Sequence, residues 1–553
     1  MQRRQFLQHS AATGITLALF GNRQLWSADA GASIEVFLDE SPAQISPNIY
    51  GHFTEHIGGV IYDGVWVGEN SKIPNNHGIR KELIDRMRQI KAPMIRWPGG
   101  CFADSYDWKD GIGPNRPTRT NFWEAEHDAL RLHEKGPQVF EPNSFGTDEF
   151  VRFCKLTGAE PYLAANLRSL PALGLDQWIE YCNSPAASTT LARQRSANGS
   201  PNPYNIHYWG IGNESWGCGG DFTPEEYATE FRRYTTWLPS YGVDLQLIGS
   251  GPNGNDIDWT RRFFEQISTG EHSYDQPLFK GWSIHHYSFG FHEENGKTVQ
   301  ADALNFDPAE WYGILRECHE VDRIITDQWA TMGQFDKEHR VKLVVDEYGP
   351  WYREGSELDP THIFGQQITV RDALATALTL DTFNRHADKV SIATCAQLVN
   401  NINALFLCHE DRFLATPNFY VFQMYAAHQG AQALRTEISA PTLHYAANGK
   451  QESGKQESFW SLNGSASRNG KNVTVTLVHP ELGQEKQVQI ALRGSTALTA
   501  SATVLASNDI HAHNTFDQPN TVTLKQLACT VRDGAVHLTV PPASVTAIQI
   551  EVN

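Results

Sequence analysis

Two glutamates stand in surroundings that suit acid and base chemistry. Glu214 directly follows Asn213, Glu347 directly follows Asp346, and a tryptophan comes shortly after each glutamate. Hydrolysis of a glycosidic bond needs such a pair, with one carboxyl protonated and the other charged at the same pH. Repulsion between nearby carboxylates raises one pKa, while an adjacent cation such as Arg96 would keep the other carboxyl ionised. The pair therefore predicts glycosidic bond hydrolysis.

Four histidines raise the question of a metal site. His52 and His56 are four residues apart, and His285 and His286 are adjacent. No His-Glu-x-x-His pattern and no histidine and cysteine cluster with ligand spacing accompanies them, so no metal site is predicted. We expect these imidazoles to donate to sugar hydroxyls or to the two glutamates. A serine esterase is disfavoured because Gly-x-Ser-x-Gly is absent near any predicted strand end.

The elements that must position these residues follow an alternating pattern of short apolar runs and longer helical segments, such as 78–91 and 224–241. Eight such runs predict the parallel βα units of a TIM barrel. An open doubly wound sheet is the runner-up, but the sequence has neither Gly-x-Gly-x-x-Gly after a first strand nor a phosphate loop. The runs cover residues 49–53, 94–98, 161–166, 206–212, 245–250, 282–287, 342–346 and 390–396.

In a barrel of this kind the working face lies at the carboxyl ends of the strands. Nearly every predicted strand delivers a polar side chain there, which brings distant parts of the sequence to one rim. The residues at these ends are Glu55, Arg96, Cys101, Asn213, Glu214, His285, Tyr287, Asp346, Glu347, Trp351 and Gln397.

The chain divides into four predicted segments. Residues 1–30 read as a signal peptide, 31–48 as N-terminal strands that join the C-terminal domain, and 49–425 as the catalytic barrel. After residue 425 the pattern changes to alternating strands broken by turns, which predicts an antiparallel, jelly-roll-like β-sandwich over 426–553.

The N-terminal segment resembles a twin-arginine export signal. Arg3-Arg4 precedes a mildly apolar run at 11–20 and an Ala-Asp-Ala cleavage pattern at 28–30. The eight cysteines are scattered without a Cys-x-x-Cys pair, which predicts buried thiols rather than an oxidative framework, with Cys101 as an exception. These features favour export of the folded chain to the periplasm or the medium.

Charge and hydropathy narrow the partners. The formal net charge of −18 excludes the basic surface that nucleic acids require, and it suits neutral substrates better than polyanions. No run of eighteen apolar residues follows the first thirty positions, so no membrane segment is expected in the mature form. An aromatic content of 11% suits stacking on sugar rings.

Five motifs together identify a family resemblance. They are GHFTEH (51–56), RWPGGCFADSYDWKDGIGP (96–114), WGIGNESWGCGG (209–220), VVDEYGPW (344–351) and AQLVNN (396–401). In order and spacing they resemble the α-L-arabinofuranosidases of glycoside hydrolase family 51, from about residue 45 to 425. The resemblance implies a (β/α)₈ barrel with a jelly-roll-like C-terminal domain, a retaining mechanism, and no metal or organic cofactor.

The resemblance also implies roles for individual residues. Glu214 matches the acid/base and Glu347 the nucleophile, while Arg96 and Tyr287 match residues beside the nucleophile. The remaining matched positions bind the sugar, through side chains, through the backbone around Cys101, or through apolar walls. They are Glu55, Cys101, Asn213, His285, Trp351 and Gln397, with Trp123 as a second wall.

Two segments depart from the family pattern. Leu167-Arg168-Ser169 replaces a glycine-containing segment after the third strand, and the loop 114–145 is long, with an acidic and histidine-containing stretch at 124–133. Both should border the leaving-group side. The expected substrates are arabinoxylan or arabinan oligosaccharides and polymers, cleaved at non-reducing arabinofuranosyl ends, and the family implies a homo-oligomer, a hexamer. The alternatives are a β-glucan- or β-xyloside-cleaving glycosidase on this scaffold and a non-catalytic carbohydrate-binding protein.

Overall fold

The computed structural model describes residues 31–123, 140–268, 278–294, 296–353, 362–446 and 456–553. The predicted signal peptide and residues 124–139 of the long loop lie outside these ranges. Among the helices of the described ranges, none combines the length and apolar composition needed to cross a lipid bilayer.

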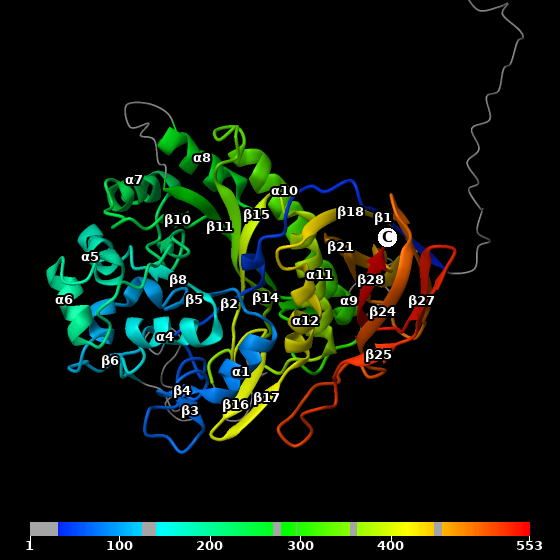
Figure 1. Cartoon of the computed structure of the whole chain (residues 1–553), viewed down its shortest axis with the longest axis horizontal. Coiled ribbons are helices and arrows are strands. Elements are labelled where there is room, and N and C mark those ends of the chain that lie inside the picture. Colours follow the sequence, from blue (N-terminus) through cyan, green and yellow to red (C-terminus); the bar gives the residue numbers. More distant parts are fainter. Residues whose placement is uncertain (1–30, 124–139, 269–277, 295, 354–361, 447–455) are drawn as a thin grey trace, which may run out of the picture.

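Eight parallel strands close into a barrel, which confirms the predicted fold (Figure 1). Each strand falls on one of the eight predicted runs, and the hydrogen-bonded order around the barrel is β10-β11-β14-β15-β2-β5-β8-β9. The strands are β2 (Gly51–Phe53), β5 (Met94–Trp97), β8 (Glu160–Ala165), β9 (Tyr208–Ile211), β10 (Gln246–Gly249), β11 (Phe279–Ser288), β14 (Lys342–Pro350) and β15 (Val390–Cys395).

The barrel is filled by side chains rather than open. Side chains from five different strands form one small apolar cluster, and strands on opposite sides of a closed barrel can meet only through its interior. The cluster consists of Met94, Tyr162, Ile248, Val344 and Ile392. Because this layer is apolar and filled, the polar residues at the carboxyl ends of the strands lie above a rigid floor.

The barrel strands alternate with helices that begin where the sequence supplies a cap. Before α7, the Thr223 hydroxyl accepts from the backbone N–H of Glu226 at 3.3 Å, and the Glu226 carboxylate accepts from the Thr223 N–H at 2.8 Å. Pro224 occupies the first helical position, where no N–H is needed. The helices are α1 (Lys81–Gln89), α4 (Thr147–Thr157), α5 (Ala172–Asn183), α6 (Thr190–Ala197), α7 (Pro224–Thr235), α8 (Ile257–Ser268), α9 (Pro308–His319), α10 (Val321–Met332), α11 (Val370–Arg385) and α12 (Pro417–Tyr425).

A ten-stranded sheet forms the C-terminal domain, and it folds over so that β24 contacts β26 around its own apolar core. Its order is β25-β24-β28-β22-β21-β18-β1-β23-β27-β26. The strands are β1 (Ala32–Phe37), β18 (Gln432–Ser439), β21 (Asn463–Asn469), β22 (Asn472–His479), β23 (Lys486–Arg493), β24 (Ala497–Ala506), β25 (Lys525–Leu527), β26 (Cys529–Arg532), β27 (Ala535–Val540) and β28 (Ser544–Val552).

The N-terminal strand β1 lies inside this sheet, between β18 and β23. It pairs antiparallel with β18 but parallel with β23. The prediction of a purely antiparallel sandwich is therefore wrong at this one pair. The reason is that β1 comes from the other end of the chain, so no hairpin turn fixes its direction relative to β23.

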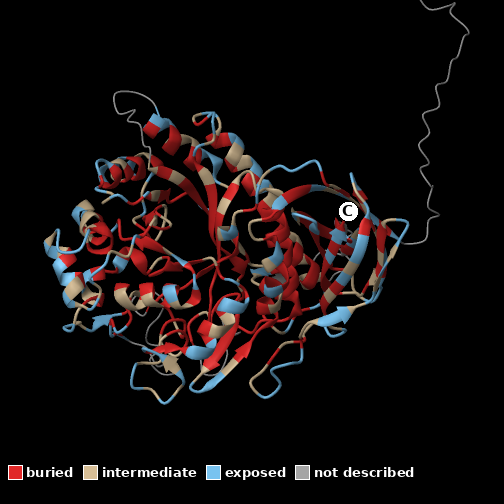
Figure 2. Cartoon of the chain, in the orientation of Figure 1, coloured by how far each residue is buried: buried red, intermediate tan, exposed pale blue. Residues whose placement is uncertain are grey.

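Helix α11 joins the two domains. Fifteen of its sixteen residues are buried, all but Arg385, and it contacts the barrel strand β14 as well as β18, β21, β22 and β28 (Figure 2). Polar contacts fix this junction, since the Asp381 carboxylate accepts from the hydroxyls of Ser465 and Thr476 at 2.7 and 2.6 Å. Barrel and sheet therefore share one continuous buried interface.

Candidate active site

Glu347 lies at the carboxyl end of β14, buried and held on both carboxyl oxygens. Arg96, at the end of β5, donates from Nη1 to Oε1 at 2.7 Å, and the Tyr287 hydroxyl donates to Oε2 at 2.7 Å. Both donors favour the charged form of Glu347. The Arg96 guanidinium is itself fully buried, and removing one partner of such a pair costs about 3–5 kcal/mol because the other charge stays uncompensated.

Glu214 follows β9 and faces Glu347 across the rim. Its backbone has a φ of 40°, in the left-handed region that side-chain-bearing residues rarely adopt, a feature that concentrates at functional sites. Asn213 beside it accepts from Arg96 Nη2 at 2.6 Å. Carboxyl oxygens of Glu214 and Glu347 lie within 4.8 Å of each other. That spacing is close to the roughly 5–5.5 Å of retaining glycosidases and well below the roughly 6.5–9.5 Å of inverting ones.

His285 stands between the two glutamates. Its Nδ1 lies 2.9 Å from Glu214 Oε1 and 3.6 Å from Glu347 Oε2, while its Nε2 lies 3.3 Å from Asp346 Oδ1. Burial alone would lower the pKa of His285, but the three carboxylates outweigh it and raise the pKa to about 10. An imidazolium therefore separates the two carboxyl groups at neutral pH.

Asp346, directly before Glu347, supports this arrangement from below. Its carboxylate accepts from the Ser283 hydroxyl at 2.5 Å and from the Tyr162 hydroxyl at 2.8 Å. Burial opposes its charge, yet Arg96 and His285 hold the pKa of Asp346 below its ordinary value. Asp346 is thus a fixed anion that keeps both cations of the site in place.

Glu55 and Gln397 meet at the opposite side of the rim. Glu55 Oε1 accepts from the backbone N–H groups of Gly100 and Phe102 at 3.1 and 3.0 Å, and Oε2 accepts from Gln397 Nε2 at 2.8 Å. Burial and the nearby Glu347 charge raise the pKa of Glu55 to about 7. Within the described residues the buried Gln397 Oε1 has no hydrogen-bond partner, so an acceptor remains for a bound molecule.

Aromatic rings line another side of the rim. The Trp351 ring lies 5.1 Å from that of Tyr287 and 4.8 Å from that of Phe364. Trp123 reaches the same group through Phe364, with ring centroids 5.7 Å apart. The two tryptophans expected as sugar walls therefore belong to one aromatic group, which Phe364 completes. Phe364 was missed because it lies in no strand-end motif.

Asp104 is a second residue that sequence reasoning missed. Its fully buried carboxylate accepts from three backbone N–H groups, those of Leu167 at 2.7 Å, Arg168 at 3.2 Å and Asn213 at 2.9 Å. Burial raises the pKa of Asp104 to about 7, although these three donors lower it. It ties together the loops after β5, β8 and β9. An acidic residue inside an otherwise apolar stretch of the Arg-Trp-Pro-Gly-Gly-Cys motif was the available signal.

Three of the four expected histidine roles are wrong. His52 packs against the Phe422 ring at 4.7 Å, and burial lowers its pKa to about 3. His56 contacts the Glu141 carboxylate at 2.8 Å, and His286 contacts the Glu317 backbone carbonyl at 2.9 Å. Only His285 contacts the two glutamates, because side chains of successive strand residues point to opposite faces.

The expectation for the cysteines is also corrected. Cys101 and Cys218 form a disulfide, with Cα atoms 5.6 Å apart and a sequence separation of 117 residues. It joins the loop after β5 to the loop after β9. The remaining cysteines are thiols, all buried except the half-buried Cys529 in β26.

The two segments that depart from the family pattern meet in space. The Arg168 guanidinium lies over the Phe122 ring at 5.6 Å, so the segment after β8 contacts the described beginning of the long loop. The acidic and histidine-containing stretch 124–133 lies outside the described residues.

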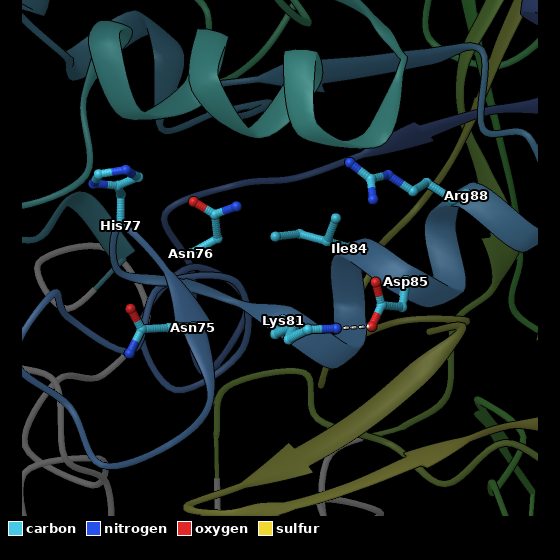
Figure 3. Close-up of a pocket in the computed structure, with 7 residues that line it drawn as sticks. All are labelled: Asn75, Asn76, His77, Lys81, Ile84, Asp85 and Arg88. Carbon is cyan, nitrogen blue, oxygen red and sulfur yellow. Dashed lines mark hydrogen bonds and ion pairs between the residues drawn. The ribbon is translucent and has the colours of Figure 1, made fainter.

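A separate hollow lies between the hairpin β3 (Asn75–Asn76) and β4 (Ile79–Arg80) and helix α1 (Figure 3). His77, Ile84 and Arg88 line it, and Lys81 pairs with Asp85 there at 2.5 Å. None of the residues predicted for the site lines this hollow.

Comparisons with known proteins agree with this geometry. Two family models match, the α-L-arabinofuranosidase 1 domain over residues 86–290 and the α-L-arabinofuranosidase C-terminal domain over residues 346–544. A Bacteroides ovatus protein named intracellular exo-α-L-arabinofuranosidase is 33% identical over 533 residues, which cover 95% of this chain and 96% of the relative.

Solved structures give the same picture. The glycoside hydrolase family 51 arabinofuranosidase of Xanthomonas axonopodis pv. citri matches with a TM-score of 0.84 and 33% identity, over 95% of this chain and 100% of that one. The α-L-arabinofuranosidase of Thermotoga maritima in complex with arabinose matches with a TM-score of 0.78 and 27% identity, over 94% and 100%. None of these names describes a β-glucan- or β-xyloside-cleaving enzyme or a non-catalytic sugar-binding protein, the two alternatives raised by the sequence.

Proposed function

The chain belongs to the α-L-arabinofuranosidases of glycoside hydrolase family 51, and from that premise we propose that Glu347 is its nucleophile and Glu214 its general acid/base. The observation that carries this assignment is the unequal treatment of the two carboxyl groups. Arg96 and Tyr287 both donate to Glu347 and favour its charged form, whereas Glu214 contacts the single ring nitrogen of His285.

In the first step, Glu347 attacks the anomeric carbon while Glu214 gives its proton to the departing oxygen, which leaves a covalent arabinosyl-enzyme. Negative charge thereby moves from Glu347 to Glu214. His285 lies beside both carboxyl groups, so its positive charge remains close to the negative one throughout. Glu214 then takes a proton from water, and the second displacement restores the starting configuration.

Sugar recognition is assigned to the opposite side of the rim. Glu55, Asn213 and Gln397 are proposed to bind the furanose hydroxyls, and the unpartnered Oε1 of Gln397 supports this because it needs a donor. The backbone on either side of Cys101 already binds Glu55, which fixes that loop against the sugar site. Trp351 is proposed as the apolar wall.

Azide distinguishes the roles of the two glutamates. In Glu347→Ala, azide should attack an aryl α-L-arabinofuranoside directly and give the inverted β-azide. In Glu214→Ala the nucleophile remains, so the rate should fall by roughly 10²–10⁴ and less for leaving groups that need no protonation. Azide should then release the accumulated intermediate as the α-azide, identified by nuclear magnetic resonance. Interchanged anomers would reverse the assignment, and absence of both products would leave neither role standing.

The proposed natural substrates are arabinoxylan- and arabinan-type oligosaccharides, cleaved at non-reducing arabinofuranosyl ends. The contact between Arg168 and Phe122 supports a leaving-group side shaped by this chain's own loops. Rates of arabinose release from an arabinoxylan oligosaccharide and from a linear arabino-oligosaccharide should differ in the wild type, and Arg168→Ala should change their ratio.

We also propose that the chain is exported through the twin-arginine route and works in the periplasm or outside the cell. Arg3-Arg4 supports the route, and the Cys101–Cys218 disulfide suits an oxidising compartment. The Bacteroides ovatus relative is named intracellular, so its name does not support export. Arg3→Lys with Arg4→Lys should retain the precursor in the cytoplasm, measured by cell fractionation. Export of that double variant at the wild-type level would reject the twin-arginine route.

A homo-oligomer, hexameric as in the family, is the remaining proposal. Sedimentation at micromolar concentration measures it directly, and a monomer there would reject it.

A further inference from the structure

The Cys101–Cys218 disulfide lies directly beside the proposed acid/base. The sulfur atoms of Cys101 and Cys218 lie 3.8 and 3.6 Å from Glu214 Oε2. The other carboxyl oxygen, Oε1, is the one that contacts His285. The two oxygens of Glu214 therefore face different partners, and Oε2 is turned to the sulfurs.

These distances match those between ligands of a tetrahedral zinc ion. Zinc bonds of about 2.3 Å to sulfur and about 2.0–2.2 Å to oxygen place neighbouring ligand atoms about 3.5–3.8 Å apart. Both sulfur-to-Oε2 distances already lie at that separation. Only the two sulfurs are closer, because they are bonded to each other, and breaking the bond moves them apart to nonbonded contact.

We propose that, when the disulfide is reduced, Cys101, Cys218 and Glu214 bind a thiophilic divalent cation such as zinc. In the reduction, a dithiol supplies two electrons and two protons, the protein gains two thiols, and the dithiol becomes a disulfide. Zinc binding then releases the two thiol protons to solvent. The ion takes Oε2 of Glu214 and so prevents proton donation to the leaving group, a consequence that rests on the proposed role of Glu214.

The surroundings suit such a site. All three side chains are partly exposed, so an ion can enter, and a fourth position remains for water. The Asn213 amide donates towards Cys218 Sγ at 3.9 Å, which helps to orient that sulfur. Two thiolates and one carboxylate would exceed the charge of zinc by one, and the adjacent His285 imidazolium balances the excess.

The test compares the oxidised and reduced forms of the full enzyme. The protein is reduced with a phosphine, freed of it by anaerobic gel filtration, and titrated with zinc during hydrolysis of an aryl α-L-arabinofuranoside. Micromolar zinc should inhibit the reduced form, with recovery on chelation, and leave the oxidised form unaffected. Cobalt titration gives an independent readout, because thiolate ligands produce a charge-transfer absorption band.

Variants separate the site from its consequence. Cys218→Ser removes one ligand, and because even an outer-shell partner is worth about 10–100-fold in metal affinity, cobalt binding should weaken by at least ~100-fold. Glu214→Gln should weaken binding without any activity measurement, so this result stands even if the role of Glu214 is wrong. Cys529→Ser, which changes a half-buried thiol in β26, should keep both the disulfide and the zinc response.

Two outcomes would overturn the proposal. One is a reduced wild type that binds cobalt no more tightly than Cys218→Ser. The other is a reduced enzyme that is inactive even with chelator present, because inhibition would then come from loss of the disulfide and not from an ion.

Discussion

At the scale of single residues, the site depends on how closely backbone and side chains approach Glu347. Arg96 and Tyr287 hold its two oxygens, and Gly100 packs against the carboxyl group from a third side. A Cβ on Gly100 would stand 2.6 Å from Glu347 Oε1. The carboxylate cannot swing away without losing one of its two donors, so glycine is required here by contact rather than by backbone conformation.

Gly100→Ala should therefore displace the nucleophile. We expect kcat to fall by about 10²-fold, the loss that a displacement of about 1 Å can cause, with little change in thermal stability. Steady-state kinetics and a melting curve measure both. Gly313→Ala is the matched control, because nothing lies within 4 Å of that Cβ in α9. A kcat within twofold of the wild type would show that Glu347 tolerates the shift.

At the scale of elements, the catalytic rim is held together by contacts between loops that follow different strands. The disulfide joins the loops after β5 and β9, and Asp104 joins both to the loop after β8. Such contacts set the positions of Asn213 and Glu214 more firmly than the short strand β9 alone. Asp104 touches no reacting atom in the proposed mechanism, so it is a positioning residue.

Asp104→Asn should test this positioning role. An amide group brings N–H donors against backbone N–H groups, and an unsatisfied buried donor costs about 1–3 kcal/mol. We expect a lower melting temperature and a kcat about tenfold lower, with KM little changed because Glu55 and Gln397 are untouched. Asp107→Asn, at the cap of a short helix three residues later, serves as the control. An equal loss in both variants would point to general destabilisation.

At the scale of the whole molecule, the barrel and the sheet are joined by buried polar groups as well as by α11. His428, after α12, contacts the hydroxyls of Ser467 and Thr476 in the sheet at 2.7 and 3.2 Å. Burial lowers the pKa of His428 to about 3. Because an unfolded histidine titrates near 6.5, the unfolded chain binds this proton more readily than the folded one.

The stability contributed by neutral His428 should thus be fully present above pH ~6.5 and be lost as the pH falls towards 3. His428→Gln removes the titration, so its free energy of unfolding should depend less steeply on pH, by up to about 1.4 kcal/mol per pH unit. Denaturant unfolding at pH 7, 5 and 4, each value roughly spaced over this window, measures the difference. His444→Gln, at an exposed position in β19 (Thr442–Ala446), should keep the wild-type slope.

The sequence by itself determined the features that depend on neighbouring residues along the chain. Apolar runs located all eight barrel strands, and polar residues at their ends identified Glu214 and Glu347, because parallel strands in a closed barrel bring those ends to one rim. The same logic placed Glu55, Arg96 and Tyr287 there. The local pattern alone carries this information.

Only the tertiary structure decided which distant side chains meet. The pairing of Cys101 with Cys218, 117 residues apart, left no local pattern, and neither did the three backbone donors to Asp104. The directions of His52 and His286 likewise depend on how each strand packs against its surroundings. The physical reason is that strand periodicity fixes the face on which a side chain lies, whereas its partner is set by loops and helices that fold back from elsewhere in the chain.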